Sequence, residues 1–298
     1  MSATLLVTGA SGQLGQRVLH HLLDTLKVEP RRIVATTRKP QSLAAWAERG
    51  VAVRTADFDD AASLPAAFAG AQRALLISTD ALDRPGRRLA QHRAAVAAAE
   101  QAGVQHLVYT SMPNADRASV LIAPDHAATE AALAASRLPG WTVLRNHWYF
   151  ANLFMSLPAI LGNGGQWFHA TGAGKAANIA RDDLARAAAT VLAGSEAGKT
   201  TYTLSGGEAL TTAEQAALIA QALGRPITAI PVPVEGLVQG MVGAGLPPPL
   251  AQVFASFDTN TADGHVGTVT GAYQRITGRV PQTFAAWLAA HRDHLQPR

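Results

Sequence analysis

The chain has 298 residues, of which 48% are hydrophobic, enough for one large domain or two coupled domains with a sizeable core. Its formal net charge is +4, but no basic run exceeds two residues, so nucleic-acid binding has little support. Cysteine is absent, which excludes disulfides, thiolate metal sites and a cysteine nucleophile.

The first predicted strand begins by Thr4 and stops at a glycine turn, and an amphipathic helix follows from Gln13. One apolar helix face is predicted by the spacing of Leu14, Val18, Leu19, Leu22, Leu23 and Leu26. A strand, a glycine turn and a helix in this order open a dinucleotide-binding unit.

The glycines of this turn follow the spacing G-x-x-G-x-x-G. Gly9 lets the chain reverse, Gly12 lets a pyrophosphate approach the backbone, and Gly15 lets the helix pack closely. The alternative is an ordinary strand–helix turn without a ligand. We predict that the turn binds the cofactor phosphates through Thr8, Gly9, Ala10, Ser11, Gly12, Gln13, Leu14 and Gly15.

The second predicted strand, residues 31–37, ends at a cationic pair, Arg38 and Lys39. In NAD-binding units an acidic residue at this place binds the ribose 2′-hydroxyl, whereas a cation suits the 2′-phosphate of NADP. The alternative is a surface charge of no special role. The sequence therefore predicts NADP(H) as the cofactor, with Arg38 on the 2′-phosphate.

The third and fourth predicted strands, residues 51–55 and 73–79, supply further cofactor contacts at their carboxyl ends. We expect Asp57 and Phe58 beside the adenine, and Ile77, Ser78 and Thr79 near the ribose. Asp59 or Asp60 is also a candidate for capping the next helix.

Helices at 85–102 and 124–136 separate the fourth, fifth and sixth strands, the last two at 106–111 and 141–145. This alternation predicts an α/β fold, a Rossmann-like doubly wound parallel sheet with helices on both faces.

The alternation breaks after Arg145, where an aromatic cluster, residues 146–152, leads into an apolar helix. Residues 162–174 are rich in glycine, a helix capped by Asp182 and Asp183 follows, and residues 200–204 return as a strand. Pro247–Pro249 separate two later helices. We predict a dinucleotide-binding domain of residues 1–150 with 175–205. A smaller, mostly helical lobe of 206–298 with 151–174 would enclose the substrate.

The tyrosine–lysine pair of short-chain dehydrogenases, spaced four residues apart, is absent. The residues four positions after Tyr109, Tyr149, Tyr202 and Tyr273 are Pro113, Leu153, Gly206 and Thr277. His126, in the helix after the fifth strand, is a candidate to contact the nicotinamide ribose or relay a proton. The alternative is a polar position that faces solvent.

Metal chemistry and nucleophilic hydrolysis lack support. His20, His21, His291 and His294 are predicted to be surface residues without a third metal ligand, and no G-x-S-x-G elbow occurs. No apolar run reaches membrane-spanning length and no signal peptide precedes the first strand, so we expect a cytoplasmic protein with no membrane partner.

Several segments together resemble the NmrA-like, atypical short-chain dehydrogenases/reductases, which include bacterial NAD(P)H:quinone oxidoreductases of type 2 and triphenylmethane reductases. The resemblance spans nearly the whole chain and is strongest through Asp183. It rests on Val7–Gly15, Arg38, Ala56–Phe58, Tyr109–Ser111 and Leu144–Tyr149.

The resemblance implies NADPH binding by residues 9–15 and Arg38, with Ser111, Leu144 and Asn146 also near the cofactor. It implies two-electron reduction of a quinone or quinone-like planar acceptor. Asn146, Tyr149 and His126 are candidates for orienting the nicotinamide or donating a hydrogen bond to a developing oxyanion. The alternative is a non-catalytic NADP(H)-binding redox sensor. A homodimer is a candidate assembly.

Overall fold

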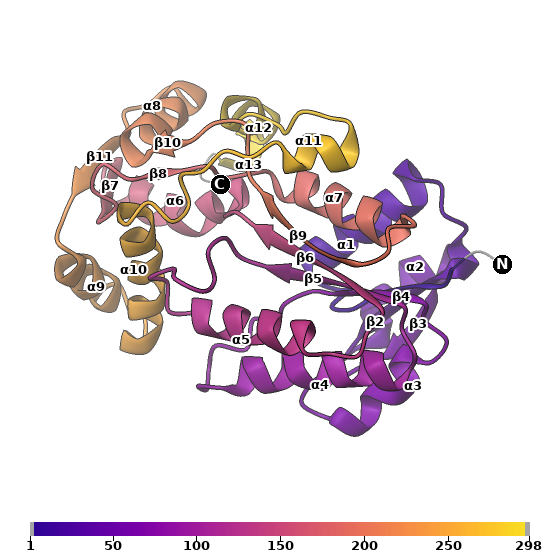
Figure 1. The fold of residues 1–298 in the computed structure, drawn as a ribbon. Coiled ribbons are helices and arrows are strands. Elements are labelled where there is room, and N and C mark those ends of the chain that lie inside the picture. The colour runs from indigo at the N-terminus through magenta and orange to yellow at the C-terminus, as the bar shows by residue number, and fades with distance from the viewer. Residues whose placement is uncertain (1–2, 296–298) are drawn as a thin grey trace.

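The computed structural model describes residues 3–295, and a seven-stranded sheet forms its centre (Figure 1). The strands are β1 Leu5–Val7, β2 Ile33–Thr37, β3 Ala52–Thr55, β4 Arg73–Leu76, β5 His106–Ser111, β6 Gly140–Asn146 and β9 Lys199–Leu204. They lie in the order β3-β2-β1-β4-β5-β6-β9, and every neighbouring pair is parallel. The predicted doubly wound α/β fold is confirmed, and the strand predicted near residue 200 does join the sheet.

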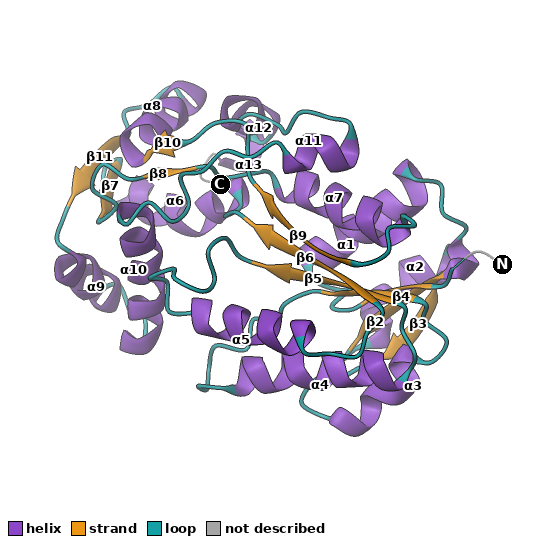
Figure 2. Ribbon diagram, in the orientation of Figure 1, coloured by secondary structure: helices purple, strands orange, loops and turns teal. Residues whose placement is uncertain are grey.

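Helices cover both faces of the sheet (Figure 2) because successive strand residues point to opposite sides. Leu5 and Val7 pack with α1 (Gln13–His20), α7 (Arg181–Ala193) and α11 (Ala272–Thr277). Leu6 packs with α3 (Leu64–Phe68), α4 (Arg87–Gln101) and α5 (Ala123–Ala134) on the other side. The short helix α2 covers Ala44–Glu48, and 3-10 turns cover Pro30–Arg32, Pro40–Leu43, Ala61–Ser63 and Phe150–Asn152.

The C-terminal part of the chain builds a smaller, mostly helical lobe. Its helices are α6 Leu153–Gly162, α8 Thr212–Leu223, α9 Val234–Gly243, α10 Pro248–Ala262, α12 Phe284–Ala290 and α13 Arg292–Leu295. Two small sheets join it, one of β7 (Gln166–His169) with β11 (Thr228–Pro231) and one of β8 (Lys175–Ala176) with β10 (Leu210–Thr211). The carboxyl ends of β5 and β6 face the side on which this lobe lies (Figure 1).

Helix α10 and the turn after it bind residues 114–121, in the loop between β5 and α5, through a set of hydrogen bonds that we call the α10 clamp. The backbone amides of Ser119 and Leu121 donate to Asn260 and Ser256, and the Asn114 amide donates to the carbonyl of His265, at 2.7–3.0 Å. The clamp joins segments about 140 residues apart in the sequence.

A buried arginine joins the sheet to the end of α7. Arg73, at the start of β4, is 8% exposed. Its guanidinium donates to the carbonyl oxygens of Val191, Leu192 and Glu196 at 2.9–3.0 Å. The carbonyls of Val191 and Leu192 lie in the last turn of α7 and have no further helical turn to bond to, so the arginine supplies their donors. Its positive charge also interacts favourably with the negative end of the helix dipole.

The first helix departs from the prediction at its C-terminal end. The α-helix stops at His20 and one π-helical turn, His21–Thr25, follows, so Leu26 is 37% exposed and lies outside the apolar face. The turn also buries His21, whose Nε2 lies 3.2 Å from a carboxylate oxygen of Asp182. The prediction that His21 is a surface residue was wrong, because α7 packs against this side of α1.

Two predicted element boundaries were also wrong. The cap of α7 is Ala180, so Asp182 and Asp183 lie in the first helical turn instead. There the Asp183 carboxylate accepts hydrogen bonds from the Tyr273 hydroxyl and the Gln282 amide at 2.7 and 2.8 Å. The fourth strand ends at Leu76, which leaves residues 77–79 as a loop.

Within residues 3–295, no helix is long and apolar enough to cross a membrane. The same part of the chain brings together no group of three or more His, Asp or Glu residues that could hold a metal ion.

Candidate cofactor and acceptor site

The glycine turn after β1 is closed by tight backbone contacts. Gly9 has φ +58°, a conformation that side chains with a Cβ rarely adopt, and its carbonyl accepts the Gly12 amide at 3.0 Å. A Cβ on Gly15 would lie 2.4 Å from the Gly9 oxygen and 2.7 Å from Cα of Ala10. Gly15 is therefore needed because the helix packs on the turn itself.

The N-terminus of α1 is open to a ligand. Gly12 is the N-cap, no side chain caps the helix, and the first turn holds no acidic residue. Ser11, Gly12 and Gln13 are exposed, while Thr8, Ala10, Leu14 and Gly15 are buried supports. Ser11 is fixed to β2 by a 2.9 Å hydrogen bond to the Thr37 hydroxyl. Free amides at the positive end of a helix dipole form an anion site, which fits a pyrophosphate.

The cationic pair lies at the carboxyl end of β2, beside this anion site. Arg38 and Lys39 are exposed, and neither side chain forms an ion pair or hydrogen bond with another residue of the described chain. An arginine without a protein partner at this place fits a 2′-phosphate, which it can bind through charge-assisted hydrogen bonds.

The loop after β3 places Asp57 and Phe58, both half-buried, at the same edge of the sheet. One Asp57 carboxylate oxygen accepts the Asp59 amide at 3.0 Å, and Phe58 packs against the core beneath α3 and α4. Asp60 accepts the Ala62 amide and caps the following turn, as one of the two predicted candidates, whereas Asp59 pairs with Arg87.

The loop after β4, residues 77–79, is held by hydrogen bonds to three different elements. The Ile77 amide donates to the Thr8 hydroxyl at 3.1 Å and the Ser78 amide to the Thr110 hydroxyl at 2.9 Å. The Thr79 amide donates to Nε2 of His92, on α4, at 3.0 Å. This bonding leaves a fixed backbone ledge next to the glycine turn.

Ser111 and Leu144 are less available than expected. The Ser111 hydroxyl donates to Glu130 at 2.6 Å, and Arg145 binds the same carboxylate at 3.0 and 2.5 Å. Leu144 is fully buried in the sheet between β5 and β9. We therefore leave the Leu144 side chain out of the proposed site.

The segment after β6 brings Tyr149 beside the glycine turn. A backbone bridge to Ile179 fixes Tyr149, and the Arg181 guanidinium lies 4.9 Å from its ring centroid. Arg181 also donates to the side chain of Gln13. Burial raises the pKa of the Tyr149 hydroxyl, and the charges of Arg181 and Arg88 oppose that rise. Asn146, the last residue of β6, is also buried, and its Oδ1 has no hydrogen-bond partner in the described structure.

His126 is 4% exposed, so the alternative that it faces solvent is wrong. Its Nδ1 lies 2.8 Å from the Tyr109 hydroxyl, and its Nε2 lies 2.8 Å from Nη2 of Arg88. An arginine can only donate, so Nε2 accepts and the proton of neutral His126 is on Nδ1. Burial and the charge of Arg88 lower the pKa of His126 well below its usual range. His126 is thus a neutral ring in this structure, with both nitrogens hydrogen-bonded.

Sequence reasoning missed Arg88 and Arg181 as members of this site. Neither residue belongs to a motif that the sequence analysis singled out. A position near the start of a helix whose N-terminus faces the carboxyl edge of the sheet was the available signal.

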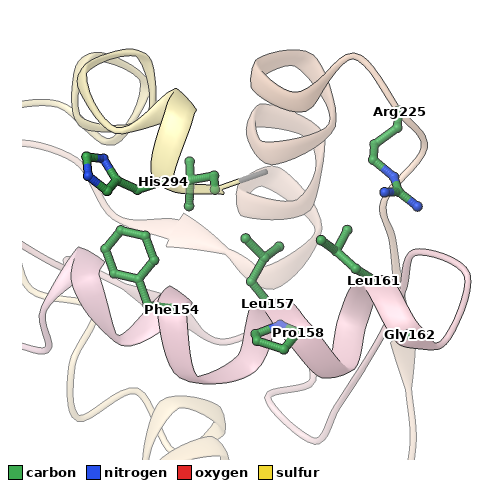
Figure 3. A pocket seen from close by; sticks show the side chains of 8 residues that line it. Phe154, Leu157, Pro158, Leu161, Gly162, Arg225 and His294 are labelled. Carbon is green, nitrogen blue, oxygen red and sulfur yellow. The ribbon is translucent and has the colours of Figure 1, made fainter. Parts of the chain in front are cut away.

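A separate cavity of about 420 Å³ lies in the C-terminal lobe, among α6, α13 and Arg225, which comes shortly after α8 (Figure 3). None of the predicted cofactor or catalytic residues lines it. Its walls are Phe154, Leu157, Pro158, Leu161, Gly162, Arg225, His294 and Leu295.

Comparison with known proteins agrees with the geometry of the glycine turn and the sheet. The family model described as "NmrA-like family" matches residues 1–288. The chain belongs to the NmrA-like family. This member is 36% identical over 281 residues to quinone oxidoreductase 2 of Escherichia coli, covering 94% of this chain and 95% of that protein.

Solved structures of other proteins resemble this NmrA-like protein over nearly its full length. The E. coli NADPH-dependent quinone oxidoreductase complexed with NADPH has a TM-score of 0.89 at 35% identity, covering 96% of this chain and 99% of that one. The Citrobacter sp. triphenylmethane reductase complexed with NADP(H) has a TM-score of 0.87 at 32% identity, covering 96% and 99%.

Proposed function

We propose that this protein is an NADPH-dependent reductase that transfers a hydride to a quinone or quinone-like planar acceptor. The observation that carries the proposal is the uncapped N-terminus of α1 with Arg38 beside it, whose side chain has no partner among residues 3–295. The similarity to quinone and triphenylmethane reductases solved with NADPH or NADP(H) supports it.

NADPH supplies the hydride when it is bound, and the residues of this chain position the cofactor and the acceptor. Free amides of the glycine turn hold the pyrophosphate, and the ledge at residues 77–79 supports the ribose. Tyr149 and Asn146 orient the nicotinamide, and His126 acts through Arg88 rather than on substrate. A quinone carries its own electron sink, so the reaction does not require the absent tyrosine–lysine pair.

The test is nucleotide titration followed by stopped-flow oxidation of NADPH with a benzoquinone. We expect NADPH to bind and to be oxidised faster than the uncatalysed background. NADPH binding without oxidation by any member of a quinone panel would contradict the catalytic proposal.

NADPH binding without oxidation would favour a second function, that of a nucleotide-binding redox sensor. The observation in its favour is that the hydroxyl of Ser111 is bonded to Glu130 and both nitrogens of His126 are occupied, which leaves neither free to donate a proton. A quinone-like acceptor and a homodimeric assembly are both parts of this proposal.

Cofactor choice gives a direct prediction for Arg38. Arg38→Ala is expected to weaken NADPH binding about tenfold or more, because a hydrogen bond to a charged group contributes about 1.5–3 kcal/mol. NADH, which lacks the 2′-phosphate, should bind the variant as it binds the wild type. Fluorescence titration with both nucleotides measures the two dissociation constants.

Arg31→Ala is the matched control, since Arg31 lies in the 3-10 turn before β2, away from the carboxyl end of that strand, and pairs with Glu29. Equal weakening of NADPH and NADH by Arg38→Ala would show that Arg38 does not bind the 2′-phosphate.

A further inference from the structure

Arg88 is a buried cation at the start of α4. It is 5% exposed, and it takes part in no ion pair with any residue from 3 to 295. It lies in the first turn of α4, where the helix dipole is positive and no acidic residue is present. A buried charge is costly unless it is paired, so the position requires an explanation.

The contacts of Arg88 fix one edge of the guanidinium and leave the other unused. Nε donates to the Thr79 carbonyl at 2.6 Å and Nη2 donates to Nε2 of His126 at 2.8 Å. Nη1 is buried and has no hydrogen-bond partner within the described residues. The planar guanidinium therefore holds a fixed orientation and keeps donor capacity for a group that the chain does not provide.

The two histidines around Arg88 cannot share its role. Nε2 of His92 accepts the Thr79 amide, so its proton is on Nδ1, directed at the Thr129 hydroxyl at 3.0 Å. Burial lowers the pKa of His92 to about 3 and that of His126 well below its usual range, so both rings are neutral at neutral pH. Arg88 is the positive charge within this cluster.

We propose that Arg88 is a catalytic residue that donates a hydrogen bond through Nη1 to the acceptor oxygen that becomes an anion when the hydride is added. This inference rests on the proposed reductase function and names the group that stabilises its product. Bound NADPH would supply a hydride with its two electrons, the quinone would thereby become its hydroquinone monoanion, and Arg88 would stabilise that anion until it takes one proton from solvent.

The position of Arg88 favours the acceptor oxygen over the cofactor phosphates. The pyrophosphate cradle lies after β1, whereas Arg88 bonds to Thr79 after β4 and to His126 on the helix after β5. Tyr149, after β6, lies close enough that the charge of Arg88 acts on its hydroxyl. These are the segments expected around the ribose and nicotinamide.

The test uses 4-nitrophenol, whose phenolate absorbs visible light and mimics the hydroquinone anion. The free protein and its complex with NADP+ are titrated with the probe across a range of pH, without turnover. We expect the wild type to bind the phenolate in preference to the phenol. Arg88→Met should weaken phenolate binding about tenfold or more, and Arg88→Lys should restore part of it.

Arg93→Met is the matched control, because Arg93 lies on the same helix but is exposed. Melting temperatures of all variants exclude misfolding, and Arg88→Lys keeps the test valid if the methionine variant does not fold. An unchanged phenolate preference in Arg88→Met, or no phenolate binding by the wild type, would overturn the proposal. So would a tenfold loss of NADP+ affinity without a change in phenolate binding. Because the probe needs no hydride transfer, a failure of the reductase proposal would appear separately, in the stopped-flow experiment.

Discussion

Replacing Gly15 with alanine is expected to weaken NADPH binding by about 30-fold or more. The new Cβ would lie 2.4 Å from the Gly9 oxygen and 2.7 Å from Cα of Ala10. These neighbours are backbone atoms, so α1 must move away from the turn, and overpacking of this kind costs about 1–3 kcal/mol. The displacement would move the backbone amides out of the positions in which they bind the pyrophosphate. Fluorescence titration of NADPH measures the change.

Gly240→Ala is the matched control, since no atom of residues 3–295 lies within 4 Å of a Cβ at that position in α9. It should bind NADPH as the wild type does, and alanine in a helix should leave stability equal or slightly higher. If Gly15→Ala retained wild-type affinity, the glycine turn would not be the nucleotide cradle.

Arg73→Met is expected to lower the free energy of unfolding by about 3 kcal/mol. The substitution keeps much of the apolar stem but removes the donors to Val191, Leu192 and Glu196, whose carbonyls would remain partly buried. The positive charge at the end of α7 would also be lost. Urea denaturation followed by circular dichroism gives the midpoint and slope from which the change is calculated.

Arg54→Met provides the comparison. Arg54 also donates to backbone carbonyls, those of Ala67 and Ala69, but it lies in a more exposed position at the edge strand β3. We expect a loss of about 1 kcal/mol there. Equal losses in the two variants would show that burial of Arg73 adds nothing to its contribution.

The sheet and the glycine turn could be predicted because their signals are local. Leu5–Val7 form a buried apolar run, and Gly9, Gly12 and Gly15 mark the turn by spacing alone. The burial of His21 could not be predicted, because it depends on Asp182, 161 positions later on another helix.

The hydrogen bonds inside the candidate site also could not be predicted from the sequence, because they join residues that are distant along the chain. Arg88 and His126 stand on different helices, and nothing local indicates that they bond to each other. The sequence alone indicates that the Ser111 hydroxyl is available to a ligand, whereas in the structure it donates a hydrogen bond to Glu130. Residue types at strand ends can be predicted from the chain, but their partners require the tertiary structure.

The α10 clamp has a consequence for the order in which the protein is assembled during synthesis. Residues 9–79, which contain the nucleotide cradle and its ledge, leave the ribosome well before Ser256 and Asn260, the clamp residues on α10. Contacts between distant segments form slowly because a long loop must close first. Residues 114–121 therefore cannot form their hydrogen bonds to α10 until the last quarter of the chain has been synthesised. A nascent chain truncated ahead of α10 lacks those partners altogether.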